Sequence, residues 1–155
     1  MKPEYLLETP AKLNLGLRIL EQRPDGFHNI QSVFQTVDLC DRILVGRLSA
    51  KNEDQLEVSG PVEIPADSSN LVLKTLKALR KGKIELPPLE IKLEKKIPTG
   101  AGLGGGSGNA AGIIHLAARI GETRNPCVLR GITLGFNRQK LFHVFDSSKL
   151  SCAGF

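Results

Sequence analysis

The 155-residue sequence lacks any apolar run near the roughly 18 residues that a membrane-spanning helix requires. Its first twelve residues, MKPEYLLETPAK, have neither the hydrophobic segment of a secretion signal nor the Arg- and Ser-rich composition of a transit peptide. We therefore expect a cytoplasmic protein with no membrane partner. A hydrophobic content of 41% over this length is sufficient for one domain with its own core.

Cysteine is also scarce, and its three positions are far apart: Cys40, Cys127 and Cys152. An odd number of cysteines without a Cys-x-x-Cys pair fits neither a disulfide framework nor a zinc or redox site, so we expect free thiols. The three histidines likewise lack the spacing of metal ligands: His28, His115 and His143. The sequence therefore predicts no metal held by protein ligands.

The sequence has few aromatic residues, 5% of the total, and no dense run of basic residues, although its formal net charge is +5. A basic protein can bind nucleic acid through phosphate contacts. Here the charges are scattered, and no series of aromatic side chains is available for stacking on bases. We expect no nucleic-acid partner, with a basic nucleic-acid-binding module as the alternative.

Strict alternation of apolar and polar residues over 12–20, KLNLGLRIL, predicts a half-buried strand with four apolar side chains on one face: Leu13, Leu15, Leu17 and Ile19. Lys12 and Asn14 then project together from the polar face, close enough to serve one ligand. The Pro-Asp-Gly sequence in QRPDGFHN indicates a turn. Apolar and β-branched residues predict further strands at 30–39, 42–48 and 55–59.

Helical spacing of apolar residues predicts a helix over residues 70–81, with a Ser/Asn cluster before it and Gly82 after it. The alternation in LEIKLE at 89–94 predicts a strand with one solvent-exposed face, which is typical of antiparallel sheets. A second helical pattern follows in NAAGIIHLAARIG and ends at Gly121. No element is predicted beyond Gly121, because the apolar runs there are short and have no sustained period.

Between that strand and the second helix lies the glycine-rich stretch IPTGAGLGGGSGNAAG, residues 97–112. Glycine leaves no Cβ between the backbone amides and a ligand, and a helix that begins directly afterwards adds its own unpaired amides. The arrangement favours a phosphate-binding loop over the alternative of a flexible linker. No lysine follows the glycines as in a P-loop. A Gly-x-Gly-x-x-Gly pattern is formally present, but the strand before it alternates too cleanly for a dinucleotide fold.

This stretch resembles the Pro-x-x-x-Gly-Leu-Gly-x-Ser-Ser-x-Ala motif of the GHMP kinases. TPAKLNLGLRI and RPDGFHNIQSVFQTVDLCD resemble the signature of those members that use ATP to phosphorylate the 2-hydroxyl of 4-diphosphocytidyl-2-C-methyl-D-erythritol, in non-mevalonate isoprenoid biosynthesis. The resemblance implies that residues 1–121 form an α+β lobe like domain 2 of ribosomal protein S5, with a mixed, mostly antiparallel sheet and helices on one face. A GHMP kinase for another alcohol, such as mevalonate or homoserine, is the alternative, against which the PDGFH segment argues.

The resemblance also implies roles for single residues. Lys12 matches the catalytic lysine, Asn14 a position in the substrate pocket, and Phe27 and His28 the pair that stacks on and hydrogen-bonds the cytosine. The ATP site is implied at Asn70, Lys96, Gly102, Gly104, Gly105, Gly106 and Ser107, and Ser107 could also face the Mg²⁺ that accompanies ATP. Two simpler readings stay open, a solvated strand lysine for Lys12 and a plain helix cap for Asn70.

The sequence departs from the family pattern in two places. Gly108 stands where the family has Ser or Thr, which removes one hydroxyl and weakens the start of the helix. After residue 121 no Gly-x-Asp-Val-Pro segment with its catalytic aspartate is recognisable, and Asp146 lacks the neighbours that would give it this role. We therefore expect residues 122–155 to be a tail foreign to the fold, and the chain to be a truncated or frame-shifted kinase of impaired activity.

Overall fold

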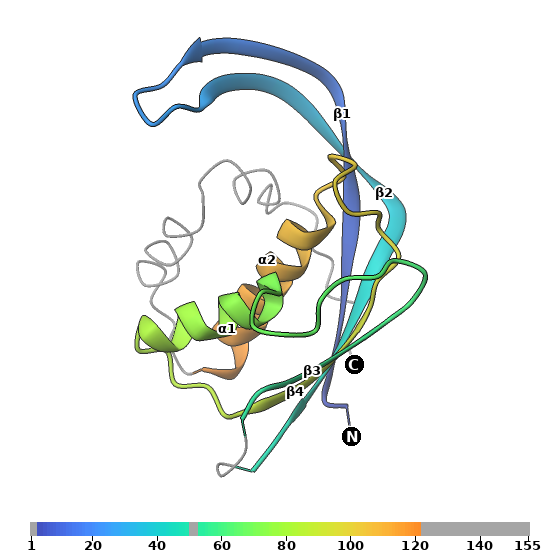
Figure 1. Ribbon diagram of the computed structural model, residues 1–155, viewed down its shortest axis with the longest axis vertical. Helices are drawn as coiled ribbons and strands as arrows, with labels where there is room; N and C mark the ends of the chain where they lie inside the picture. The colour runs from blue at the N-terminus through green and yellow to red at the C-terminus, as the bar shows by residue number, and fades with distance from the viewer. Residues whose placement is uncertain (1–2, 50–52, 122–155) are drawn as a thin grey trace.

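The structure is a computed structural model that describes residues 3–49 and 53–121. The elements follow one another in the order β1 (Tyr5–Gln22), β2 (His28–Arg47), β3 (Gln55–Ser59), α1 (Leu71–Lys81), β4 (Leu89–Glu94) and α2 (Gly105–Ile120). Both helices cover the same face of the sheet (Figure 1). The expected α+β lobe is thereby confirmed. Residues 122–155, for which a separate tail is predicted, lie outside the described residues.

The sheet has the strand order β1-β2-β4-β3. β2 pairs antiparallel with both β1 and β4, whereas β3 runs parallel to β4. The sheet is therefore mixed and mostly antiparallel, as predicted. The alternation in β4 also has the expected effect, because Leu89, Ile91 and Leu93 are buried while the residues between them are partly exposed.

The core lies between the helices and the middle of the sheet. Side chains from β2 and β4 pack against the apolar stripes of α1 and α2, with these residues buried: Ile43, Val45, Ile91, Leu93, Val72, Leu76, Leu79, Ile113 and Leu116. Burial of each such side chain contributes on the order of 1.5–3 kcal/mol before conformational entropy is subtracted. The core thus fixes β4 and α2, which flank the glycine-rich stretch in the chain, and the neighbouring strand β2.

The strands predicted at 30–39 and 42–48 form one continuous strand, β2, and β1 begins at Tyr5 rather than at residue 12. The apparent break comes from a register shift: Pro10 pairs with Cys40 but Ala11 with Val37, so β2 has two more residues than β1 at this point. Such a bulge bends a hairpin without ending it. Cys40 is a free thiol, and burial raises its pKa.

Beyond this shift the two strands extend past the helices as a two-stranded arm, residues 12–36, which curves toward the side of the sheet on which the helices lie (Figure 1). Residues 12–20 form a strand as predicted, but the prediction that its apolar face is buried was wrong, since Leu15, Leu17 and Ile19 are 65%, 56% and 64% exposed. The error has two causes. No helix in the described part of the chain covers the arm, and a second register shift between Asn14 and Gly16 interrupts the alternation of faces.

Candidate active site

The glycine-rich stretch forms an open loop that leads into α2. Gly100, Gly102 and Gly104 have φ of 76°, 72° and 78°, a left-handed conformation that glycine adopts without strain. A Cβ at Gly100 or Gly102 would meet no atom within 4 Å, so the backbone there is accessible to a ligand. Gly104 caps α2 without a side-chain hydrogen bond. The first turn of α2 therefore retains amide groups that can receive an anion.

β1 is attached directly to this loop. The amide of Lys12 donates to the carbonyl oxygen of Leu103 over 2.9 Å. A Cβ at Gly104 would lie 3.2 Å from Cγ of Lys12, so the lysine stem passes closely over the residue that precedes the helix. Glycine at 104 is thus required both by its φ and by the passage of Lys12.

The Lys12 ammonium is held by polar and aromatic neighbours. Its Nζ donates to Oδ1 of Asn14 over 2.5 Å and lies 5.2 Å from the ring centroid of Phe34. Nδ2 of Asn14 donates to the hydroxyl of Ser32 over 3.1 Å, and that hydroxyl donates to the carbonyl oxygen of Gly16. Burial lowers the pKa of Lys12 below the ordinary lysine value. Sequence reasoning missed Ser32 and Phe34, because their positions depend on the register of a bulged hairpin.

The four residues predicted for catalysis and substrate binding line one hollow on the arm, which we call the arm hollow. Its volume is about 290 Å³, and Lys12, Asn14, Phe27 and His28 share its lining with these residues: Leu17, Ile19, Gly26 and Ile30. The second register shift explains this lining, because the extra residue at 15 places Leu17 on the same side as Asn14. Phe27 is 38% exposed and thus accessible to a planar ligand.

A second hollow of about 240 Å³, the helix hollow, lies between the start of α1 and the start of α2. Two residues predicted for ATP, Asn70 and Gly106, line it together with these residues: Ile64, Pro65, Ser69, Leu71, Val72, Lys95, Thr99 and Asn109. Asn70 is also the N-cap of α1, since its Oδ1 accepts from the amide of Val72 over 2.9 Å. The cap reading of Asn70 is therefore correct, and its predicted role toward ATP is neither supported nor opposed by that bond.

The other residues predicted for ATP lie at or near the loop. Gly105 is buried, and a Cβ there would lie 2.8 Å from both Cγ2 of Ile97 and Nζ of Lys95. Ser107 is partly buried in the first turn of α2. Lys96 is partly exposed, and its Nζ pairs with Oε1 of Glu94 at 3.0 Å, so it lines neither hollow.

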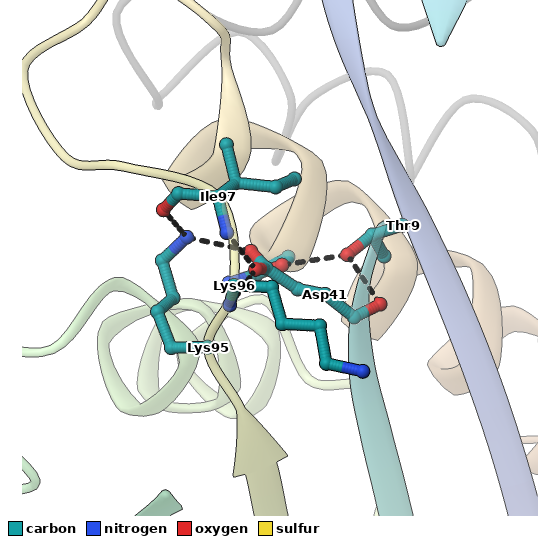
Figure 2. A network of polar contacts seen from close by, with 6 residues as sticks. Thr9, Asp41, Lys95, Lys96 and Ile97 are labelled. Atoms are coloured by element: carbon teal, nitrogen blue, oxygen red, sulfur yellow. Dashed lines mark hydrogen bonds and ion pairs between the residues drawn. The ribbon is translucent and has the colours of Figure 1, made fainter. Parts of the chain in front are cut away.

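A buried network that sequence reasoning missed lies behind the loop (Figure 2). Nζ of Lys95 donates to Oδ2 of Asp41 over 2.7 Å, and the amides of Lys96 and Ile97 donate to Oδ1 of Asp41, each over 2.8 Å. A signal for both charged residues was present. The alternation that buries Leu93 continues to Lys95, and the alternation that buries Ile43 extends back to Asp41. No cluster of three or more potential metal-ligating side chains occurs among residues 3–49 and 53–121.

Residues 70–136 match the family model for the N-terminal domain of GHMP kinases, a segment that includes α1, β4, the glycine loop and α2. The matched segment is a GHMP kinase N-terminal domain. The matched segment extends past residue 121, where the lobe is predicted to end, and the division into residues 1–121 and 122–155 stays a prediction.

Among curated GHMP kinases, the chain is 44% identical over 109 residues to 4-diphosphocytidyl-2-C-methyl-D-erythritol kinase of Persephonella marina, a match that covers 70% of this chain and 38% of that protein. It is 40% identical over 155 residues to the enzyme of the same name from Methylacidiphilum infernorum, covering 89% of this chain and 53% of that one. The chain thus spans about two fifths to one half of these two relatives.

Among solved structures, a crystal structure of 4-(cytidine 5'-diphospho)-2C-methyl-D-erythritol kinase superposes with a TM-score of 0.66 at 27% identity, over 90% of this chain and 48% of that one. This likeness agrees with the sheet order and the placement of the helices described above. No helix in the described part of the chain is long and apolar enough to cross a bilayer.

Proposed function

We propose that this chain carries the ATP-binding lobe of a kinase that phosphorylates the 2-hydroxyl of 4-diphosphocytidyl-2-C-methyl-D-erythritol. The names of the two relatives described above support this substrate over other alcohols. The single observation that carries the proposal is the position of Lys12. Its stem passes over Gly104 of the glycine loop, while its side chain lines the arm hollow together with Phe27 and His28.

The open glycine loop suits the phosphates of ATP. Amides of Gly102, Gly104 and the first turn of α2 would hold the phosphates, and the helix hollow beside Asn70 and Gly106 would receive the remainder of the nucleotide. Bound ATP supplies the phosphoryl group, and the Mg²⁺ that accompanies it neutralises phosphate charge. Ser107, in the first turn of α2, is the residue that we expect nearest to that ion.

The arm hollow suits the cytidine end of the substrate. The partly exposed ring of Phe27 offers a face on which cytosine can stack, and His28 beside it offers hydrogen bonds. The apolar side chains of Leu17, Ile19 and Ile30 complete the wall. The acceptor hydroxyl would then extend toward Lys12 and Asn14.

Lys12 would act on the reaction by charge and position. Phosphoryl transfer is accelerated mainly by holding the reactants in line and by cations that stabilise the negative charge of the transition state. The hydrogen bond to Asn14 orients the Lys12 ammonium, and the bond from the Lys12 amide to Leu103 fixes its distance from the loop. Because the 155-residue sequence has no Asp-Val-Pro segment, we expect transfer slower by about 10²–10⁴ than with a positioned base.

A thermal melt of the chain, alone and with millimolar Mg-ATP or CDP, tests this function. Ligands that bind only the native state raise its stability, so each ligand should raise the melting temperature separately. Transfer from γ-labelled ATP to the substrate, measured for wild type and Lys12→Met with Lys92→Met as a matched surface control, tests the role of the lysine. A cooperative melt that neither ligand shifts would refute the proposed function.

A further inference from the structure

The carboxylate of Asp41 joins the sheet to the entrance of the glycine loop (Figure 2). Asp41 is 0% exposed, and its two oxygens together accept the amides of Lys96 and Ile97 and the ammonium of Lys95. The amides belong to the two residues directly before Pro98, where the chain leaves the sheet. Asp41 therefore fixes the point from which the loop departs.

Lys95 extends this attachment to the far end of the loop. Its side chain is 1% exposed, and its Nζ also donates to the carbonyl oxygen of Ile97 over 2.5 Å. The same Nζ lies 2.8 Å from the place that a Cβ of Gly105 would occupy, so the first residue of α2 rests against the ammonium. The buried Asp41–Lys95 ion pair thus contacts both ends of the loop, at Ile97 and at Gly105.

A further bond ties this arrangement to β1. The hydroxyl of Thr9 donates to Oδ1 of Asn109 in α2 over 2.7 Å, and Thr9 faces Asp41 across the β1–β2 pairing. Three residues after Thr9, Lys12 bonds Leu103 in the loop. The network consequently sets the loop, the start of α2 and the strand of Lys12 relative to one another.

Stability alone does not account for such a pair. Two charges lose their hydration when they are buried, and an apolar pair of similar volume is often as stable or more stable. The ion pair instead contributes a defined backbone geometry, because each hydrogen bond fixes a backbone group at a defined distance and angle. This property matters most where backbone amides must converge on a ligand.

We propose that Asp41 is a positioning residue for nucleotide binding, which acts through Lys95 and the amides of Lys96 and Ile97 to hold the glycine loop where it can receive phosphates. This role rests on the proposed function, since it presupposes that the loop binds ATP. Asp41 lines neither hollow, so its effect must pass through its partners, the loop entrance at Lys96 and Ile97 and the Lys95 side chain.

Asp41→Asn tests the role, because it preserves the shape of the side chain and removes the charge that holds Lys95. Affinities for Mg-ATP and for CDP are measured on the 155-residue chain by calorimetry, first for wild type. We expect ATP affinity to fall about tenfold or more, the size of effect that follows from slight misplacement of binding groups. CDP affinity should stay within about twofold, because the arm hollow does not contact the network.

Asp54→Asn is the matched control for a purely structural effect. The carboxylate of Asp54 also holds a cation and a backbone amide, because it accepts from Arg80 and, over 2.9 Å, from the amide of Leu89. None of these three residues lines either hollow. Loss of the Asp54 carboxylate should lower the melting temperature and leave both affinities unchanged. Equal ATP affinity in wild type and a folded Asp41→Asn variant would overturn the proposed role of Asp41 and leave the proposed function unaffected.

If Asp41→Asn gives no cooperative melt, the double variant Asp41→Asn/Lys95→Met takes its place, because no charge is then left buried without a partner. Its reference is Lys95→Met, since Lys95 lines the helix hollow and can affect ATP directly. Weaker ATP binding in the double variant than in Lys95→Met supports the role, and equal binding overturns it. Failure of the wild-type chain to bind ATP would instead overturn the proposed function, and the role of Asp41 with it.

Discussion

At the scale of single residues, Phe27 offers the sharpest test of the arm hollow. Stacking requires an aromatic ring and little else, so Phe27→Tyr should bind CDP as wild type does, whereas Phe27→Ala should lose about 1–3 kcal/mol. Phe27 is 38% exposed, so neither change should lower the melting temperature appreciably. Titration calorimetry with CDP measures the difference. Unchanged affinity in Phe27→Ala would place the cytosine elsewhere.

Lys12 leads to a prediction about pH. Burial lowers its pKa from the ordinary 10.5 in the folded chain, while in the unfolded chain the value is ordinary. The unfolded state therefore binds more protons just below pH 10.5, and the contribution of Lys12 to the free energy of unfolding rises with pH in that window. NMR titration of ¹³C-methylated lysines should show Lys12 deprotonating at lower pH in the folded chain than in the chain unfolded by urea. A Lys12 signal with the same midpoint in both states would contradict this, and bound ATP should shift the midpoint of the folded chain back upward.

At the scale of elements, the first turn of α2 contains two glycines that should respond in opposite directions. A Cβ at Gly108 would lie 3.7 Å from Cβ of Thr9, an ordinary contact, so Gly108→Ala should stabilise the helix by about 0.5–1 kcal/mol. A Cβ at Gly105 would come within 2.8 Å of Ile97, so Gly105→Ala should destabilise by about 1–3 kcal/mol. Urea melts of both variants measure the two effects. A gain at Gly105 would mean that the loop is looser than the structure indicates.

The elements also show how far the sequence could predict the fold. Periodicity located α1, β4 and the end of α2 closely, because each has one face packed on a single core. The start of α2 was missed, because the helix begins at Gly105 within the glycine-rich stretch and not at Asn109. Periodicity gave the wrong burial for the arm, because a register shift of one residue exchanges the two faces of a strand. Such a shift cannot be recognised from the amino-acid composition. Asp41 and Lys95 were missed for a related reason. Their positions obey the alternation of β2 and β4, but a charge at an inward position is understood only when its partner, distant in the sequence, is known.

At the scale of the whole molecule, the arm and the core should differ in stability. β2 and β4 are covered by both helices, so the amides paired between Ile43 and Leu93 should exchange with solvent only when the whole domain unfolds. The strands of the arm, residues 12–36, pair only with each other for most of their length, and their amides should exchange through smaller openings.

Each ligand should slow amide exchange in a different segment. CDP should slow exchange in the arm around Phe27, and ATP should slow it in the loop around Gly104, since a bound ligand must leave or be accommodated before the backbone it contacts can open. Exchange followed by mass spectrometry of peptides, with and without each ligand, resolves these segments. Uniform rates across arm and core would mean that the arm opens only with the domain. If CDP and ATP slowed the same peptides, the two ligands would share one site, and Lys12 would not lie between the phosphoryl donor and the acceptor.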